Sequence, residues 1–208
     1  MPHTLRSTFR LAVLGCLAVL VVVPAALAQD KPPAGGMSKE QLAMMEAMQK
    51  AGTPGENHKL LASMVGDWAF VNRMWTDPAA PPTESTGTAS YTMLMDGRFL
   101  VGHYQGTMMG MEFDGRGVTG YDNTTKQFQS VWLDNFGTMM MFMTGTYDPT
   151  ARAFTYLTEM ADPMAPATRI KVREVIRLES PDRHVMEWYE TRGGREAKTM
   201  EIVYTRKK

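Results

Sequence analysis

The stretch Thr53-Pro-Gly-Glu-Asn-His-Lys-Leu-Leu-Ala-Ser-Met-Val-Gly-Asp-Trp68 joins a short helix to the head of a long series of strands. Thr53 is suited to cap the helix, Pro54 to occupy its first position, and Glu56 to complete a capping box. Gly66 predicts the helix end, because glycine takes the left-handed conformation at little cost. The apolar residues in between recur at helical spacing, so this helix has one apolar face that needs a cover.

From Trp68 onward the apolar pattern alternates, and turn residues recur at short intervals. Connections this short and free of helices require antiparallel neighbours, and closure into a barrel would remove both exposed edges. We therefore predict an all-β, up-and-down antiparallel β-barrel of about ten strands, preceded by one or two short α-helices. The predicted strands are residues 67–75, 84–95, 98–108, 111–121, 127–134, 138–147, 153–160, 168–178, 183–191 and 196–206.

Residues 1–28 have the three parts of a secretory signal peptide. Arg6 and Arg10 form a basic region, residues 11–23 are almost continuously apolar, and Ala26-Leu27-Ala28 is a small-x-small cleavage site. We predict cleavage after Ala28 and a periplasmic or secreted protein, with no stable membrane span after cleavage.

Two alternatives exist for this segment. A membrane anchor would need about 20 apolar residues, and Pro24 interrupts the run before that length is reached. Cys16 loosely resembles a lipoprotein acceptor site, but too little apolar sequence precedes it. The predicted organisation is a signal peptide at 1–28, a linker and N-terminal helix at 29–52, and a barrel domain with a helical plug at 53–208.

Composition excludes several classes of function. Cys16 is the only cysteine, so the chain after cleavage would have no disulfide, no thiol chemistry and no cysteine-based metal site. The full sequence has 22 basic and 22 acidic residues, and no basic block is present. A near-neutral chain gives no electrostatic reason to expect nucleic acid as a partner.

Several motifs after residue 52 carry a family resemblance. They are Thr53-Pro-Gly-x-x-His58-Lys, Gly66-x-Trp68, Asp77-Pro-x-x-Pro-Pro82, Asp96-Gly-Arg-Phe99, Gly120-Tyr-Asp-Asn123, Trp132-x-Asp134-x-x-Gly137 and Met200-Glu-Ile-Val-Tyr-Thr-Arg206. Together they resemble the bacterial secreted family called domain of unknown function 1579, over essentially the whole mature chain. The Gly-x-Trp opening is similar to that of calycins, the superfamily of lipocalins and fatty-acid-binding proteins.

The resemblance implies a calycin-like barrel but carries no established activity. In calycins the tryptophan of Gly-x-Trp closes one barrel end and packs under an arginine of the last strand. This implies that Trp68 and Arg206 form a structural plug, with a cation–π contact as the physical reason.

Strand alternation also predicts which residues face the barrel interior, or lumen. Apolar inward faces with a few polar groups are typical of barrels that bind small ligands, so we expect an apolar or amphipathic small molecule as the partner. A single bulge would invert the assignment on any strand. The predicted ligand-binding residues are Tyr91, Met93, Phe99, His103, Phe113, Trp132, Met141, Tyr156, Glu174 and Trp188.

Glu174 lies on the apolar face of its strand, where a carboxylate is costly unless it is paired. It would either pair with an inward arginine such as Arg98 or Arg116 or anchor the polar head of a ligand. Asp134, beside a turn, is more typical of a turn or rim residue than of an acid catalyst.

The chain is methionine-rich, with 20 methionines and clusters at residues 108–111 and 139–143. Thioethers select Cu(I), so copper handling is one hypothesis. However, alternation would place Met139, Met141 and Met143 on one face and Met140 on the other, so adjacent sulfurs cannot all meet one ion. Core packing, or a pliable ligand pocket, explains the clusters better.

His103 and His184 each share a strand face with large apolar residues. Haem-binding calycins of the nitrobindin type make either one a conceivable axial ligand, although a lone strand histidine is more typically a hydrogen-bonded polar residue. No metal-ligand spacing and no catalytic motif is found, so no metal site, catalytic residue or cofactor is assigned. A ligand-binding role is favoured over an enzyme, and a protein-interaction module without a small ligand is the remaining alternative.

Overall fold

The fold comes from a computed structural model that describes residues 36–208 except residue 78. The predicted signal peptide and most of the predicted linker lie outside the described residues. Two helices come first, α1 (Lys39–Gly52) and α2 (Glu56–Ala62). Ten strands follow: β1 (Gly66–Met74), β2 (Thr83–Leu94), β3 (Phe99–Met108), β4 (Met111–Asp122), β5 (Gln127–Asp134), β6 (Met141–Asp148), β7 (Ala153–Asp162), β8 (Ala165–Ser180), β9 (Arg183–Arg192) and β10 (Arg195–Arg206).

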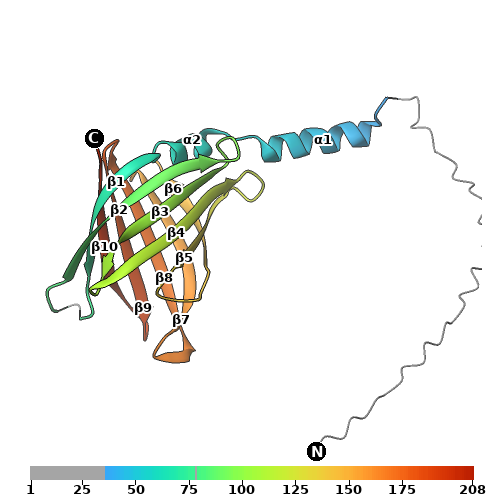
Figure 1. Cartoon of the computed structure of the whole chain (residues 1–208). Helices are drawn as coiled ribbons and strands as arrows, with labels where there is room; N and C mark the ends of the chain where they lie inside the picture. The colour runs from blue at the N-terminus through green and yellow to red at the C-terminus, as the bar shows by residue number, and fades with distance from the viewer. Residues whose placement is uncertain (1–35, 78) are drawn as a thin grey trace, which may run out of the picture. The chain divides into compact units, whose positions relative to one another are not determined.

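The strands form one closed barrel in which each pairs antiparallel with its neighbour in sequence (Figure 1). The first and last strands close the barrel, with Trp68 opposite Arg206 at one end of the β1–β10 ladder and Met74 opposite Met200 at the other. The predicted all-β meander is therefore confirmed. No helix within the described residues is long and apolar enough to cross a membrane.

Alternation of buried and exposed residues along the strands determines which side chains fill the barrel interior. In β6, Met141, Met143 and Gly145 are buried, while Phe142 and Thr144 between them are exposed. Such a pattern fixes the pairing register, because a slip by one residue would turn every apolar side chain to solvent.

The start of α2 differs from the prediction. Its N-cap is Gly55 rather than Thr53, and the Gly55 N–H donates to Nδ1 of His58 over 3.0 Å. Thr53 is engaged elsewhere, since its hydroxyl donates to the Gln49 carbonyl in the last turns of α1 over 2.6 Å. The helix also ends at Ala62, several residues before Gly66.

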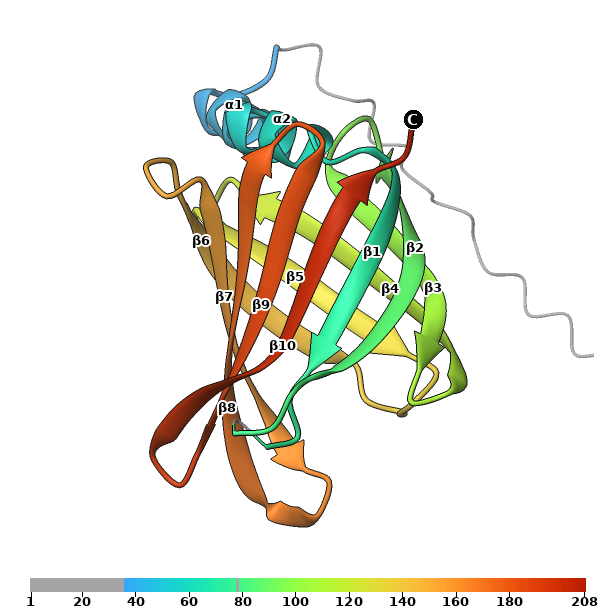
Figure 2. The same ribbon diagram turned by 90° about the vertical axis from the view of Figure 1, so that its left-hand side faces the viewer.

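One end of the barrel is closed by α2 (Figure 2). Leu61 of α2 is 1% exposed, and the Trp68 indole N–H donates to the Met64 carbonyl over 2.9 Å. The guanidinium carbon of Arg206 lies 4.2 Å from the Trp68 ring centroid. Gly66 has a φ of +129°, and a Cβ there would lie 2.5 Å from Nη1 of Arg206, so the glycine of Gly-x-Trp leaves room for the arginine.

Candidate ligand-binding site

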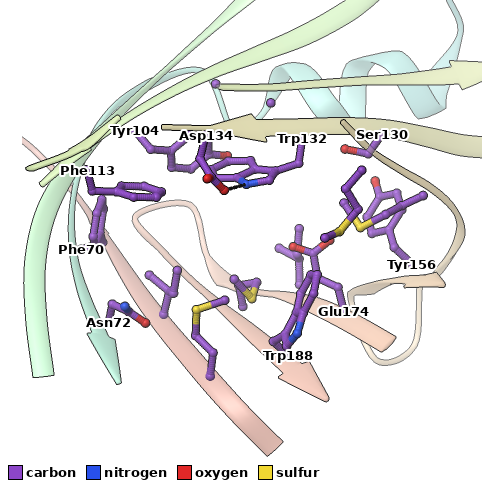
Figure 3. A pocket seen from close by; sticks show the side chains of 18 of the residues that line it. Phe70, Asn72, Tyr104, Phe113, Ser130, Trp132, Asp134, Tyr156, Glu174 and Trp188 are labelled. Carbon is purple, nitrogen blue, oxygen red and sulfur yellow. Dashed lines mark hydrogen bonds between the residues drawn. The ribbon is translucent and has the colours of Figure 1, made fainter. Parts of the chain in front are cut away.

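A cavity of about 370 Å³ occupies the lumen (Figure 3). All ten strands contribute to its wall, which consists mainly of aromatic, methionine and other apolar side chains. It lies toward the end opposite α2, because the ends of strands remote from α2 contribute Met74, Met108, Met160 and Glu190. The cavity therefore has the size and apolar character of a small-molecule site.

Four tyrosines, Tyr91, Tyr104, Tyr156 and Tyr204, bound the inner end of this cavity. They also line a second cavity of about 60 Å³, which Leu61 and Met64 border from the α2 side. Burial raises the pKa of all four hydroxyls, so they stay neutral donors and acceptors at physiological pH. The tyrosine layer thus separates the ligand-sized cavity from the plugged end.

Two tryptophans of the wall are each oriented by a carboxylate two residues further along the same strand. The indole N–H of Trp132 donates to Oδ2 of Asp134 over 2.8 Å, as Figure 3 shows. The indole N–H of Trp188 donates to Oε1 of Glu190 over 3.4 Å, a weaker contact. Residues i and i+2 of a strand share a face, so in both pairs the carboxylate also lines the cavity.

Glu174 places a carboxylate deeper in the lumen. Its direct cross-strand neighbours are Tyr156 on β7 and Trp188 on β9. Within residues 36–208, residue 78 excepted, no hydrogen bond or ion pair to its carboxylate is found. Burial raises the pKa of Glu174 to about 7, so this group titrates near neutrality.

The predicted arginine partners of Glu174 are wrong. Arg98 donates to the Met95 carbonyl over 2.8 Å, in the β2–β3 turn. Nε of Arg116 lies 3.7 Å from the carboxylate of Asp114, on the outer face of β4. Arg116 alternates along β4 with Phe113 and Gly117, which line the cavity, so it faces away from Glu174, while Arg98 lies outside the strands in the turn before β3.

Seven of the ten predicted ligand-binding residues line the large cavity. They are Tyr91, Phe113, Trp132, Met141, Tyr156, Glu174 and Trp188. Met93 faces inward but packs against the buried core instead of the cavity.

The orientations predicted for Phe99 and His103 need correction, because both lie on the outer face of β3. The cavity is lined from this strand by Leu100 and Tyr104, which have the opposite parity. Phe99 is 38% exposed, and Nε2 of His103 lies 2.9 Å from Oδ2 of Asp114. His103 is therefore not a lumen ligand.

The β2–β3 register fixes the orientation of Phe99. Met95, Asp96 and Gly97 all have positive φ, and the last residue of β2 that pairs across the turn is Leu94, opposite Phe99. Residues directly opposite one another share a face, so Phe99 points outward with Leu94, which is 47% exposed.

Asn72 was missed by the sequence reasoning. It is 2% exposed and lines the cavity, its amide nitrogen donates to Oγ of Ser85 over 3.3 Å, and its Oδ1 has no hydrogen-bond partner among the described residues. Alternation along β1 through Trp68 and Phe70 would have identified it as an inward residue.

The methionine clusters divide as alternation predicts. Met139, Met141 and Met143 line the cavity, while Met140 is exposed. Among the described residues, no group of three or more His, Cys, Asp or Glu side chains could hold a metal ion. His184 is buried beside the small cavity, where its ring stacks on Tyr204.

The family described as "Protein of unknown function (DUF1579)" matches residues 53–206. The chain belongs to this family. The match begins just before α2 and ends with β10, so it spans the plug and the whole barrel of this DUF1579 protein. No curated protein matches the chain.

Two solved structures share the fold. Rv2717c from M. tuberculosis is 15% identical, with a TM-score of 0.53 over 75% of this chain and 100% of that one. The S-type phycobiliprotein lyase CPES from Guillardia theta is 14% identical, with a TM-score of 0.50 over 73% of this chain and 93% of that one. At this identity the likeness concerns the barrel fold alone.

Proposed function

We propose that this DUF1579 protein is an exported barrel that binds a small apolar or amphipathic molecule in its lumen. The observation that carries the proposal is the cavity of about 370 Å³, which has a predominantly apolar wall and a few inward polar groups. A barrel whose only task was structural would gain stability by filling this space with side chains. A phycobiliprotein lyase shares this fold, which is consistent with a ligand-binding barrel. The shared fold does not indicate which ligand is bound.

Binding is tested with the purified chain and the neutral lipophilic dye Nile red, whose fluorescence rises in an apolar site. We expect saturable binding. Ser130→Phe would fill part of the lumen, since Ser130 lines the cavity on β5. Leu133→Phe is the matched control, because Leu133 of the same strand is exposed on the outer face.

The expected result is reduced dye affinity for Ser130→Phe and unchanged affinity for Leu133→Phe, with circular dichroism to show that both variants fold. Absence of dye binding to the unmodified protein would refute a ligand-binding lumen. Equal affinity of the two folded variants would do the same.

Export is the second part of the proposal, and it is supported by the basic, apolar and small-x-small order of residues 1–28. Cell fractionation and mass spectrometry of the native protein test it. We expect a periplasmic or secreted protein with Gln29 as its first residue. Recovery from the cytoplasm with residues 1–28 intact would contradict this part alone.

A further inference from the structure

We propose that the lumen ligand carries a positively charged nitrogen, as a protonated amine or a quaternary ammonium group, which binds the Glu174 carboxylate between Tyr156 and Trp188. This inference rests on the proposed function, because it names the chemical class of the ligand for the same cavity. Its support comes from the charges, the aromatic rings and the unpaired polar atoms of the cavity wall.

The charged residues of the wall all have the same sign. Asp134, Glu174 and Glu190 line the cavity, whereas no Lys, Arg or His does so among the residues that the structure describes. A ligand with a carboxylate or phosphate head would therefore meet like charge. A cation would meet the opposite charge in a low-dielectric site, where the attraction is stronger than in water.

These three carboxylates differ in the hydrogen-bond and ion-pair partners that they already have within the protein. Asp134 accepts the Trp132 indole N–H and the backbone N–H of Phe136, the latter over 2.9 Å. Glu190 pairs through Oε2 with Nε of Arg192 over 2.9 Å. Glu174 has neither type of partner within the described part of the chain, so its carboxylate is the group left for a ligand.

The surroundings of Glu174 suit an organic cation. Tyr156 and Trp188 flank it directly across the sheet, and Figure 3 shows both rings at the same cavity as the Glu174 carboxyl. The faces of aromatic rings attract ammonium groups, and a carboxylate with two or more rings is a recurring arrangement for binding alkylated nitrogen. A small inorganic cation would instead need several oxygen ligands around one point.

The second unpaired polar atom of the wall is also an acceptor. Oδ1 of Asn72 is buried and without a partner among the described residues, while the amide nitrogen of the same side chain is occupied by Ser85. Acceptors are therefore left unpaired at two places in the wall, Glu174 and Asn72, and of the two side chains only that of Glu174 is partly exposed. Both favour a ligand that donates hydrogen bonds or carries positive charge.

The experiment compares three ligands that share a decyl chain and differ in the head group: decyltrimethylammonium, decanol and decanoate. Each competes with Nile red at concentrations below its micelle threshold, at pH 8. We expect decyltrimethylammonium to bind at least tenfold more tightly than decanol, and decanoate to bind most weakly. Glu174→Gln should remove this preference by weakening decyltrimethylammonium about tenfold, with decanol affinity unchanged.

Glu159→Gln is the control, since it makes the same charge change on the outer face of neighbouring β7, where Glu159 is exposed. Equal affinities for decyltrimethylammonium and decanol, or a preference that persists in Glu174→Gln, would overturn the inference. In either case Nile red binding would still support the proposed function. Failure of Nile red to bind would overturn both.

Discussion

The ring of His184 lies almost parallel to the ring of Tyr204, with 4.3 Å between centroids and 14° between planes, yet neither ring nitrogen has a hydrogen-bond partner among the described residues. Trp68 contacts the same imidazole edge-on at a centroid distance of 4.4 Å. His184 thus packs as a buried aromatic ring beneath the plug. Burial, with the positive charge of Arg206 as a smaller cause, lowers its pKa to about 3.

His184→Phe should stabilise the protein at pH 7 by about 1 kcal/mol, because it removes two unpaired polar atoms and keeps the ring stack. Since the folded-state pKa of His184 lies below the unfolded value of about 6.5, its neutral form favours folding above that pH, and this contribution is lost as pH falls toward 3. The variant should therefore lose less stability between pH 6.5 and pH 4. Urea unfolding at several pH values measures both effects.

His103→Phe serves as the control, because His103 is on the outer face and pairs with Asp114. A large loss of stability in His184→Phe at pH 7 would show that the two nitrogens have partners other than the described side chains.

Arg206 holds the plug to the barrel by hydrogen bonds as well as by stacking. Its guanidinium donates to the carbonyls of Val65, Ser63 and Pro181 over 2.5, 3.0 and 2.9 Å. Arg206→Met should cost about 2–4 kcal/mol, since it leaves several carbonyls without donors. Arg206→Lys should recover only part of this loss, because one ammonium cannot reproduce the planar set of donors.

Arg195→Met is the matched control for this series, as Arg195 lies at the exposed start of the same strand. The measurement is the free energy of unfolding in urea. Similar losses in the variants at 206 and 195 would contradict a specific role of Arg206 in holding the plug.

The strands could be predicted from the sequence because the patterns that indicate a strand lie within a few neighbouring residues. Alternation and turn residues gave all ten strands, and the Asp96-Gly97 signature placed the β2–β3 connection correctly. Side-chain orientation after that turn could also have been predicted. The observed pairing of Leu94 with Phe99 is the register that a two-residue Asp96-Gly97 turn would give, and it places Met93 and Phe99 on opposite faces of the sheet.

Whether the Glu174 carboxylate has a counter-ion was a feature that the sequence could not predict. Its strand pattern placed it correctly on the inward face, but whether a carboxylate finds a counter-ion depends on which strands close around it. Arg98 and Arg116 were reasonable partners by composition and are directed elsewhere. The aromatic neighbours Tyr156 and Trp188 follow from the β7–β8 and β8–β9 registers, which are properties of the closed sheet.

Gly87 makes room for a buried ring. It lies opposite Phe70 in the β1–β2 register, and a Cβ on Gly87 would be 2.3 Å from Cζ of Phe70 and 2.3 Å from the carbonyl oxygen of Gln105. Gly87→Ala should therefore cost about 2 kcal/mol or more, as expected for overpacking against backbone. Gly137→Ala should be nearly neutral, since its nearest atom would be 3.9 Å away.

Thermal unfolding of the two alanine variants tests this difference, and Phe70→Leu in the Gly87→Ala background should recover part of the loss. Identical melting temperatures for the two alanine variants would contradict the close packing of Phe70 against β2.

Glu174 should make the unliganded protein less stable as the pH rises. Burial raises the folded-state pKa from 4.5 to about 7, so folding favours the protonated carboxyl. Its stabilising contribution is fully present below pH 4.5 and is lost as the pH rises through 7. The difference corresponds to about 3–4 kcal/mol at most, at roughly 1.4 kcal/mol per pKa unit.

The tyrosines that face Glu174 do not titrate in this interval. Burial, with the Glu174 charge as a further cause, raises the pKa of Tyr104 of β3, Tyr156 of β7 and Tyr204 of β10. Asp134 and Glu190 are the remaining charged residues of the cavity wall. We therefore expect the unfolding free energy of the wild type, but not of Glu174→Gln, to fall between pH 5 and pH 8.

The comparison of the two proteins isolates Glu174, because all other titrating groups, His58 among them, are common to both. A cationic ligand should reverse the effect: decyltrimethylammonium binds the ionised carboxyl, so it should stabilise the wild type more at pH 8 than at pH 5 and leave Glu174→Gln little changed. Thermal melts with and without the amphiphile measure this. The same pH slope in both proteins would mean that water reaches the Glu174 carboxyl and that its ionisation is not opposed by burial.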